Sequence, residues 1–301
     1  RRRNEESLRA TFRRIAGADA KGRKPKRKFA EFRAIMEREL YGVVITAHPT
    51  FSQSKPMMCA MAELAMDRDG AGAKLSSAER TRLLAQAHIV EHRPPEHIDL
   101  TYEHELSLVA IQNIHRALHR AYEIAFEVAA ECYPEEWESL SPRLLTISSW
   151  VGYDLDGRSD IRWSDTLLKR LKVQLLQLER YMATIEDIRG LFKSSRGNVD
   201  LIHLMDLIES RLALGINEAR DEIDVFRDSS KEAETWIEEI RRIAKRMYGA
   251  RDVRLIESSQ LLDLVQRAIA MTELPAARIK LLILRAEIAN HGLGLAHTQD
   301  R

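Results

Sequence analysis

The sequence predicts a mainly α-helical protein with a few short β-strands. Most of the 301 residues lie in long stretches with apolar side chains at helical spacing, and Gly and Pro are few, at 13 and 8. Only three short apolar segments have the character of strands, near residues 43–48, 144–151 and 292–297. Long helical stretches precede and separate them.

The first strand candidate ends at a histidine followed by a proline. Val43, Val44 and Ile45 are β-branched and apolar, which favours a buried strand. Pro49 lacks an amide donor and disfavours a helical conformation at His48, so the strand ends there. Barrels and open α/β sheets carry reactive groups at the carboxyl ends of their strands. His48 is therefore a candidate functional residue, with a structural, hydrogen-bonded histidine as the alternative.

The second strand candidate leads into an acidic loop. Residues 144–151 are followed by Gly152, Asp154, Asp156 and Gly157. A calcium loop begins with similar spacing, but its later oxygen ligands and closing glutamate are missing. We therefore expect a strand-end loop at the mouth of a barrel.

Helices are expected to fill most of the remaining chain. Apolar periodicity predicts them at residues 5–15, 29–40, 102–132 and 163–189, after Pro56, and over most of 198–290. Gly, Asn, Ser and Pro predict turns at residues 215–217, 228–230, 248–250 and 274–275. Ser76 and Glu79 have the spacing of a capping box. The methionines after Pro56 are expected to fill a core.

Charge and cysteine content limit the possible partners and compartment. Lys and Arg total 47 against 46 Asp and Glu, so no strong field favours nucleic acid or an anionic membrane. No apolar run is long enough to span a bilayer. Cys59 and Cys132 lack metal-ligand spacing and are expected to be reduced, buried thiols of a cytoplasmic protein.

Several histidines and lysines allow a functional interpretation, but we consider a structural interpretation stronger for each of them. His88 and His92 have the spacing of a helical metal pair, but no third ligand follows at a suitable offset. His115 and His119 repeat this spacing and are assigned to a polar helix face. The basic residues 21–28 lack interleaved aromatic side chains, which favours a basic loop over a nucleic-acid site.

Three segments resemble signatures of the phosphoenolpyruvate carboxylase family. Residues 46–50, Thr-Ala-His-Pro-Thr, match its first signature. Residues 149–157 are similar to the element Ser-Trp-x-Gly-Gly-Asp-Arg-Asp-Gly. Residues 291–301 resemble a looser pattern in which a Phe-Gly-Leu run leads to an Asp-Ile-Arg end. The three matches occur in the family's order, with long helical spacers between them.

The resemblance implies a highly helical TIM-like (β/α)8 barrel, in which the three strand candidates are the first three parallel strands. Residues 1–301 would form the amino-terminal part of a single domain, with helical arms and an incomplete site. The family is usually tetrameric, which implies a homo-oligomer.

The resemblance also implies a reaction and a set of site residues. The family converts phosphoenolpyruvate and bicarbonate to oxaloacetate and phosphate with Mg²⁺ or Mn²⁺, whose ligands would lie outside this segment. His48 matches the essential histidine, and Arg301 matches an arginine that holds the phosphate group. The residues expected to shape the site are Thr46, Thr50, Asp154, Asp156 and Gly157.

The chain also departs from the family's signatures. Phe51 replaces an acidic residue, Tyr153 replaces a glycine, and Leu155 replaces an arginine. The loss of that arginine removes a cation near the phosphate site. A non-catalytic or repurposed paralogue of the same fold, acting as a binding or regulatory helical protein, is therefore the alternative hypothesis.

Overall fold

The computed structural model describes residues 2–19, 21–39, 41–46, 53–89, 98–153, 161–192, 199–227, 233–249 and 253–298. These residues are mainly helical, with one small parallel sheet, as the sequence predicts. The chain divides into two compact units, one formed by Arg1–Ile45 and Leu108–Arg301 and the other by Thr46–Ser107.

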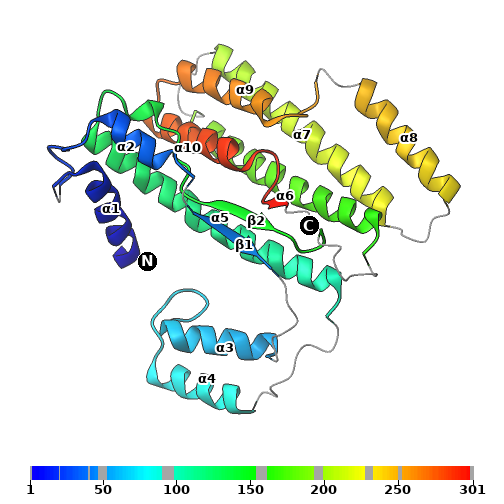
Figure 1. Ribbon diagram of the computed structural model, residues 1–301, viewed down its shortest axis with the longest axis horizontal. Coiled ribbons are helices and arrows are strands. Elements are labelled where there is room, and N and C mark those ends of the chain that lie inside the picture. The colour runs from blue at the N-terminus through cyan, green and yellow to red at the C-terminus, as the bar shows by residue number, and fades with distance from the viewer. Residues whose placement is uncertain are drawn as a thin grey trace. The chain divides into compact units, whose positions relative to one another are not determined.

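The larger unit contains the sheet, whose strands are β1 (Gly42–Ile45), β2 (Thr146–Ser149) and β3 (His297–Thr298). They are parallel and lie in the order β1-β2-β3. Parallel neighbours require a crossover, and long helical stretches supply it (Figure 1). β1 begins one residue before the segment predicted as a strand and ends within it, β2 lies inside its predicted segment, and both are shorter than predicted.

The third strand lies later than the sequence predicted. Gly292 ends α10 with a positive φ of 64° and directs the chain into a turn, so β3 begins only at His297. Tyr181 fixes this turn, because its buried hydroxyl donates to the Gly292 carbonyl oxygen at 2.8 Å. The expected strand at 292–297 is therefore mostly a turn.

The helices that lie wholly or mostly in the larger unit run beside the sheet and extend beyond it (Figure 1). They are α1 (Arg2–Ala16), α2 (Phe29–Met36), α5 (Leu100–Cys132), α6 (Trp163–Gly190), α7 (Val199–Arg227), α8 (Ala233–Gly249), α9 (Ser258–Met271) and α10 (Pro275–His291), with a short 3₁₀ turn at Trp137–Ser139. α6 and α7 pack side by side, and α10 packs against α6, α9 and β2. The main core includes Ile147 of β2 with Tyr122, Phe126 and Tyr181.

The long helix α7 corrects a predicted break. The sequence predicted a turn at residues 215–217, whereas α7 continues through Gly215. A Cβ atom at Gly215 would lie 3.1 Å from Cδ1 of Leu178 on α6. The glycine therefore allows close packing between the two helices and does not end α7.

The smaller unit contains α3 (Lys55–Met66) and α4 (Ser77–Ile89), which pack around Ala60, Leu75 and Leu83. The predicted capping box is confirmed, because Glu79 N donates to Ser76 Oγ at 3.2 Å and Glu79 Oε2 accepts from Ser76 N at 2.8 Å. The methionine prediction is wrong in part. Met57 is buried, but Met61 and Met66 are 50% and 65% exposed.

The two cysteines also differ from each other. Cys132 is buried as expected, whereas Cys59 is exposed. Both thiols are free. Cys59 lies on the side of α3 that faces away from Met57, so the apolar pattern around it did not predict its burial correctly.

Candidate functional site

The carboxyl edge of the sheet is the first candidate site. The register pairs Ile45 with Ser149, and Ser149 with Thr298, so the three parallel strands end beside one another. Ser149 Oγ donates to the Ile45 carbonyl oxygen at 3.1 Å and accepts from Val151 N at 3.2 Å. This hydroxyl therefore links the end of β1 to the turn that follows β2.

The turn after β2 is tight and is held by the beginning of α6. Tyr153 N donates to the Trp150 carbonyl oxygen at 2.9 Å, and Gly152 has a φ of +88°. From α6, Thr166 Oγ1 donates to the Gly152 carbonyl oxygen at 3.2 Å. The Tyr153 side chain is buried, and the Arg170 guanidinium lies 5.7 Å from the centroid of its ring.

Lys169 is a buried cation at this edge. It is only 5% exposed, and its aliphatic stem packs against Gly152. A Cβ atom at Gly152 would lie 2.9 Å from Lys169 Cε and closer still to Cδ. Gly152 is therefore needed both for its positive φ and for the close approach of Lys169. The sequence did not indicate a role for Lys169, because a single lysine in an amphipathic helix normally lies on the solvated face.

The Gly152→Ala variant is expected to lose about 1–3 kcal/mol of unfolding free energy, because it combines a strained φ with a clash against a buried side chain. Urea denaturation of both proteins measures the difference. Gly190→Ala is the matched control, because a Cβ atom there meets nothing within 4 Å. Equal stabilities for the two variants would contradict this reason for a glycine at position 152.

The site residues predicted from the sequence fall mainly outside the described part of the chain. His48, Thr50, Asp154, Asp156, Gly157 and Arg301 all do so, as do Phe51 and Leu155. Thr46 is described; it is exposed and follows β1 directly. The assignments of these residues remain predictions.

Two histidines of α5 are placed differently from the prediction. His115 and His119 were assigned to a polar helix face, but His115 is only 1% exposed. Its Nε2 donates to the Leu295 carbonyl oxygen at 2.5 Å. A signal for this burial exists in the sequence, because His115 continues a helical stripe that is otherwise buried and apolar, formed by Ile111, Leu118 and Tyr122.

His119 belongs to a charged triad with two other helices. Its Nδ1 lies 3.0 Å from Oε1 of Glu287 on α10, and Arg180 Nη1 of α6 lies 3.1 Å from Oε2 of the same carboxylate. Glu287 is 1% exposed. Burial tends to raise the pKa of Glu287, but His119 and Arg180 outweigh it and hold that pKa below its usual range. The hydrogen bond to Glu287 raises the pKa of His119.

The other buried polar groups of this region hold the segment before β3. Asn290 Nδ2 donates to the Leu145 carbonyl oxygen at 2.8 Å, directly before β2 begins. His297 Nε2 donates to the Asn290 carbonyl oxygen at 3.0 Å. The His291 and His115 rings are 4.7 Å apart. This network therefore lies toward the amino ends of the strands, whereas parallel α/β sheets bind ligands at the carboxyl ends of their strands.

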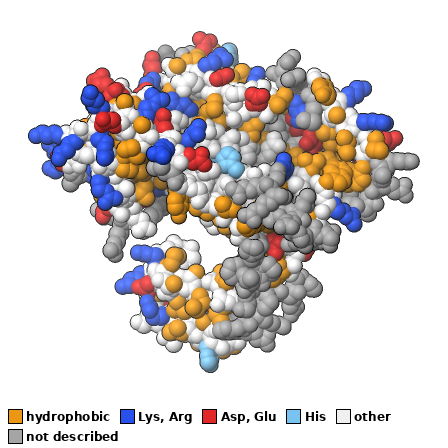
Figure 2. Space-filling model, in the orientation of Figure 1, with side chains coloured by type: hydrophobic (Ala, Val, Ile, Leu, Met, Phe, Trp, Pro, Cys, Tyr) orange, Lys and Arg blue, Asp and Glu red, His pale blue; other side chains and the backbone are white. Residues whose placement is uncertain are grey.

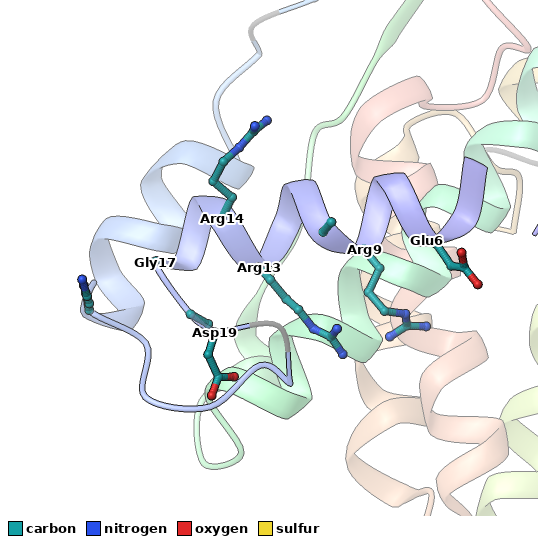
Figure 3. Close-up of a pocket in the computed structure, with 9 residues that line it drawn as sticks. Glu6, Arg9, Arg13, Arg14, Gly17 and Asp19 are labelled. Carbon is teal, nitrogen blue, oxygen red and sulfur yellow. The ribbon is translucent and has the colours of Figure 1, made fainter. Parts of the chain in front are cut away.

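A pocket of about 490 Å³ lies beside α1 and the loop that follows it. Arg9 and Arg13 point to one side of α1 and Arg14 points to the other (Figure 3). Arg13 Nη2 is 2.7 Å from Glu131 Oε2 on α5, and Arg9 pairs with Glu127 and Glu131. The two arginines are already neutralised, so this pocket is a weak candidate for an anion site.

The predicted basic loop adjoins this pocket. Figure 2 shows Lys and Arg side chains gathered over α1, α2 and the loop between them. Asp19 Oδ1 accepts hydrogen bonds from Lys21 N and Arg23 N, each at 2.9 Å, and so organises the loop from within. The contacts are local turn contacts, in keeping with the expected basic loop.

Comparisons with known proteins do not assign this chain to a family. Neither the protein-family models nor the curated proteins include a match to this chain. Across the described ranges, no group of three or more His, Cys, Asp or Glu side chains is arranged to hold a metal ion. Within the same residues, no helix combines the length and apolar character needed to cross a membrane.

Proposed function

We propose that this chain supplies part of the site of a phosphoenolpyruvate carboxylase-like lyase. The substrates would be phosphoenolpyruvate and bicarbonate, and the products oxaloacetate and phosphate. The observation that carries the proposal is the common edge at which three adjacent parallel strands end. The three family-like segments overlap or directly follow those three strand ends, in the order of the chain.

Chain connectivity supports the grouping of the site residues. His48 comes three residues after the end of β1 at Ile45, and Arg301 comes three residues after the end of β3 at Thr298. Asp154 comes five residues after the end of β2 at Ser149. Three residues of extended chain span at most about 10 Å. In the sequence, His48, Asp154 and Arg301 therefore each follow a strand end within five residues, and parallel α/β folds assemble their sites at the carboxyl ends of strands.

Each residue has a role in this proposal. His48 positions carboxyphosphate or CO2 and assists proton movement in the carboxylation step. Arg301 binds the phosphate group, for which a permanently charged, bidentate donor is well suited. Thr46, Thr50, Asp154, Asp156 and Gly157 shape the site around the reacting groups.

The proposed architecture is the beginning of a TIM-like (β/α)8 barrel. A barrel of this kind places consecutive parallel strands side by side, and the order β1-β2-β3 fits its first three strands. The remaining strands and a homotetrameric assembly in the cytoplasm are parts of the proposal that rest on the family resemblance alone.

The proposed reaction needs Mg²⁺ or Mn²⁺, which would neutralise charge around the transferring phosphoryl group. The described residues offer no fitting donor cluster. We therefore assign no metal ligand in this chain and derive no step through the metal.

The deciding experiment measures oxaloacetate and phosphate release from phosphoenolpyruvate by the full-length protein, with bicarbonate and Mg²⁺. His48→Ala is expected to lower the rate at least about 100-fold, in the range typical for loss of a group that assists proton transfer. His203→Ala, at an exposed position on α7, is the control and is expected to retain full activity. A folded wild-type protein without turnover would overturn the carboxylase proposal.

A second candidate is a repurposed protein of the same fold that binds a ligand without this reaction. The buried Tyr153 favours it, because this side chain fills space where the resembling family has only a glycine. This candidate predicts no turnover and no phosphoenolpyruvate binding in the full-length protein, so the same experiment, with a binding measurement added, separates the two.

A further inference from the structure

One side of α8 attaches this helix to the rest of the larger unit. Ile243 belongs to a buried apolar cluster to which α6 and α7 also contribute. The Trp236 ring stacks on the ring of Phe226 from α7, with 5.3 Å between the centroids. Arg246 Nη1 lies 3.1 Å from Asp221 Oδ2 of α7. These contacts fix the orientation of α8 and determine which of its side chains face solvent.

A second apolar side of α8 faces solvent. Ile237, Ile240 and Tyr248 are each at least 43% exposed, although their side chains are large and mainly apolar. With Ala244 they recur at helical spacing and form one stripe along the helix. Figure 2 shows hydrophobic side chains gathered in the region where α8 lies in Figure 1. Exposed apolar side chains that form a continuous stripe are typical of a protein–protein contact.

Three charged side chains flank this stripe on the same side. Glu238, Arg241 and Lys245 are exposed and are spaced at i, i+3 and i+7. None of the three forms an ion pair within the described part of the chain. In contrast, Arg242 pairs with Glu239 inside α8. Along the flank, one acidic side chain therefore precedes two basic ones, and all three remain available to a partner.

This order of charges is complementary to itself when the helix direction is reversed. Two antiparallel helices that pack along a shared stripe bring the same flank of each helix together, and a two-fold axis pairs their residues reciprocally. With the axis between positions 239 and 240, Glu238 of one copy lies opposite Arg241 of the other, and the reverse pair forms as well. Ile240 then lies beside its own counterpart at the axis.

We propose that two copies of this chain associate through the exposed stripe of α8, in an antiparallel contact with two-fold symmetry. A second copy fits because the flank of α8 supplies both signs of charge that the contact needs. An anionic membrane surface fits less well, because Glu238 places a negative charge beside the stripe. The inference does not depend on the proposed reaction or on the family resemblance.

The first test measures the dissociation constant of self-association of the full-length protein by sedimentation equilibrium. Glu238→Arg places like charges opposite each other on both sides of the axis and is expected to raise this constant about 5- to 30-fold. The double variant Glu238→Arg, Arg241→Glu exchanges the two charges and is expected to return the constant to within about threefold of wild type. Glu186→Arg makes the same charge change at an exposed position on α6 and is expected to have no effect.

The second test maps the direction of the contact with disulfides. It uses a Cys59→Ser background, which removes the exposed native thiol. Ile240→Cys brings two thiols together at the axis, so oxidation with diamide is expected to give covalent dimers. Tyr248→Cys is the matched control, because its counterpart would lie roughly 25 Å away at a rise of about 1.5 Å per residue. It is expected to stay uncross-linked.

Each result supports or overturns the inference. Association restored in the double variant, with cross-linking at position 240 and not at position 248, would support it. A wild-type protein that stays monomeric throughout the concentration range would overturn it, as would an oligomer whose dissociation constant is unchanged in Glu238→Arg. Weakening by Glu238→Arg without recovery in the double variant would also overturn it, because a different partner or another segment of the chain would then cover the stripe.

Discussion

Glu287→Gln is expected to lower the free energy of unfolding by about 3 kcal/mol, the low end of the range for breaking a buried charge pair. The neutral amide leaves Arg180 and His119 facing each other without the carboxylate that both of them contact. Each of α5, α6 and α10 contributes one member of the triad, so the substitution removes a charged contact that joins all three helices. Urea denaturation midpoints at pH 7 measure it.

Glu179→Gln is the matched control for this prediction. Glu179 also pairs with an arginine, Arg220 at 2.7 Å, but its side chain is 36% exposed and that of Arg220 is 57% exposed. An exposed pair of this kind contributes at most about 1 kcal/mol. If Glu287→Gln cost no more than Glu179→Gln, burial would not be the origin of the strength of the triad.

The pH dependence of the triad has a defined sign. The lowered pKa of Glu287 provides stability that is present above the pKa of the unfolded carboxyl and is lost as the pH falls through the folded value. The raised pKa of His119 provides stability that is lost as the pH rises through its folded value. The stability difference between wild type and Glu287→Gln is therefore expected to be greatest between these two pKa values.

The second large effect is acid destabilisation through His115. Burial, with a smaller contribution from the charge of Arg180, lowers the pKa of His115 to about 4, although the Leu295 carbonyl and Glu287 act in the opposite direction. The unfolded chain therefore binds a proton at this residue at a higher pH than the folded chain does. The stability linked to His115 is complete above about pH 6.5 and is lost as the pH falls toward 4.

His115→Gln tests this prediction. A glutamine amide can still donate to the Leu295 carbonyl and does not titrate. Within this window, we expect the dependence of unfolding free energy on pH to decrease by up to about 1.4 kcal/mol per pH unit. The pKa of His291 is lowered to about 3, mainly by burial and less by the charge of His115, so part of the acid dependence remains in the variant.

The control for the titration is His203→Gln, at an exposed position on α7. It is expected to leave the pH profile of stability unchanged. A His115→Gln profile that overlays the wild-type profile would contradict the assignment of His115 as a buried, neutral imidazole in the folded state.

The sequence determined several parts of the fold by itself because their causes are local. Apolar periodicity predicted most helices, and Leu274 followed by Pro275 correctly marked the start of α10. The β-branched residues of β1 and the short apolar stretch at β2 predicted strands within a few residues. Ser76 and Glu79 predicted their cap, since both partners lie within one helical turn.

Other features were decided only by the tertiary structure, because they depend on partners far apart in the chain. Gly215 would end an isolated helix, but packing against Leu178 keeps it inside α7. His115 is buried and His119 is half-buried, and their partners Leu295 and Glu287 lie 180 and 168 residues away in the sequence.

The candidate site shows the same division. His48, the acidic loop and Arg301 were selected from short motifs, whose residues are adjacent in the sequence and can be recognised without a structure. The burial of Lys169 against Gly152 became visible only in the structure, because it depends on the packing of α6 against the turn after β2. Short motifs can therefore propose reactive groups, whereas the charged groups near a sheet edge depend on contacts between separate elements.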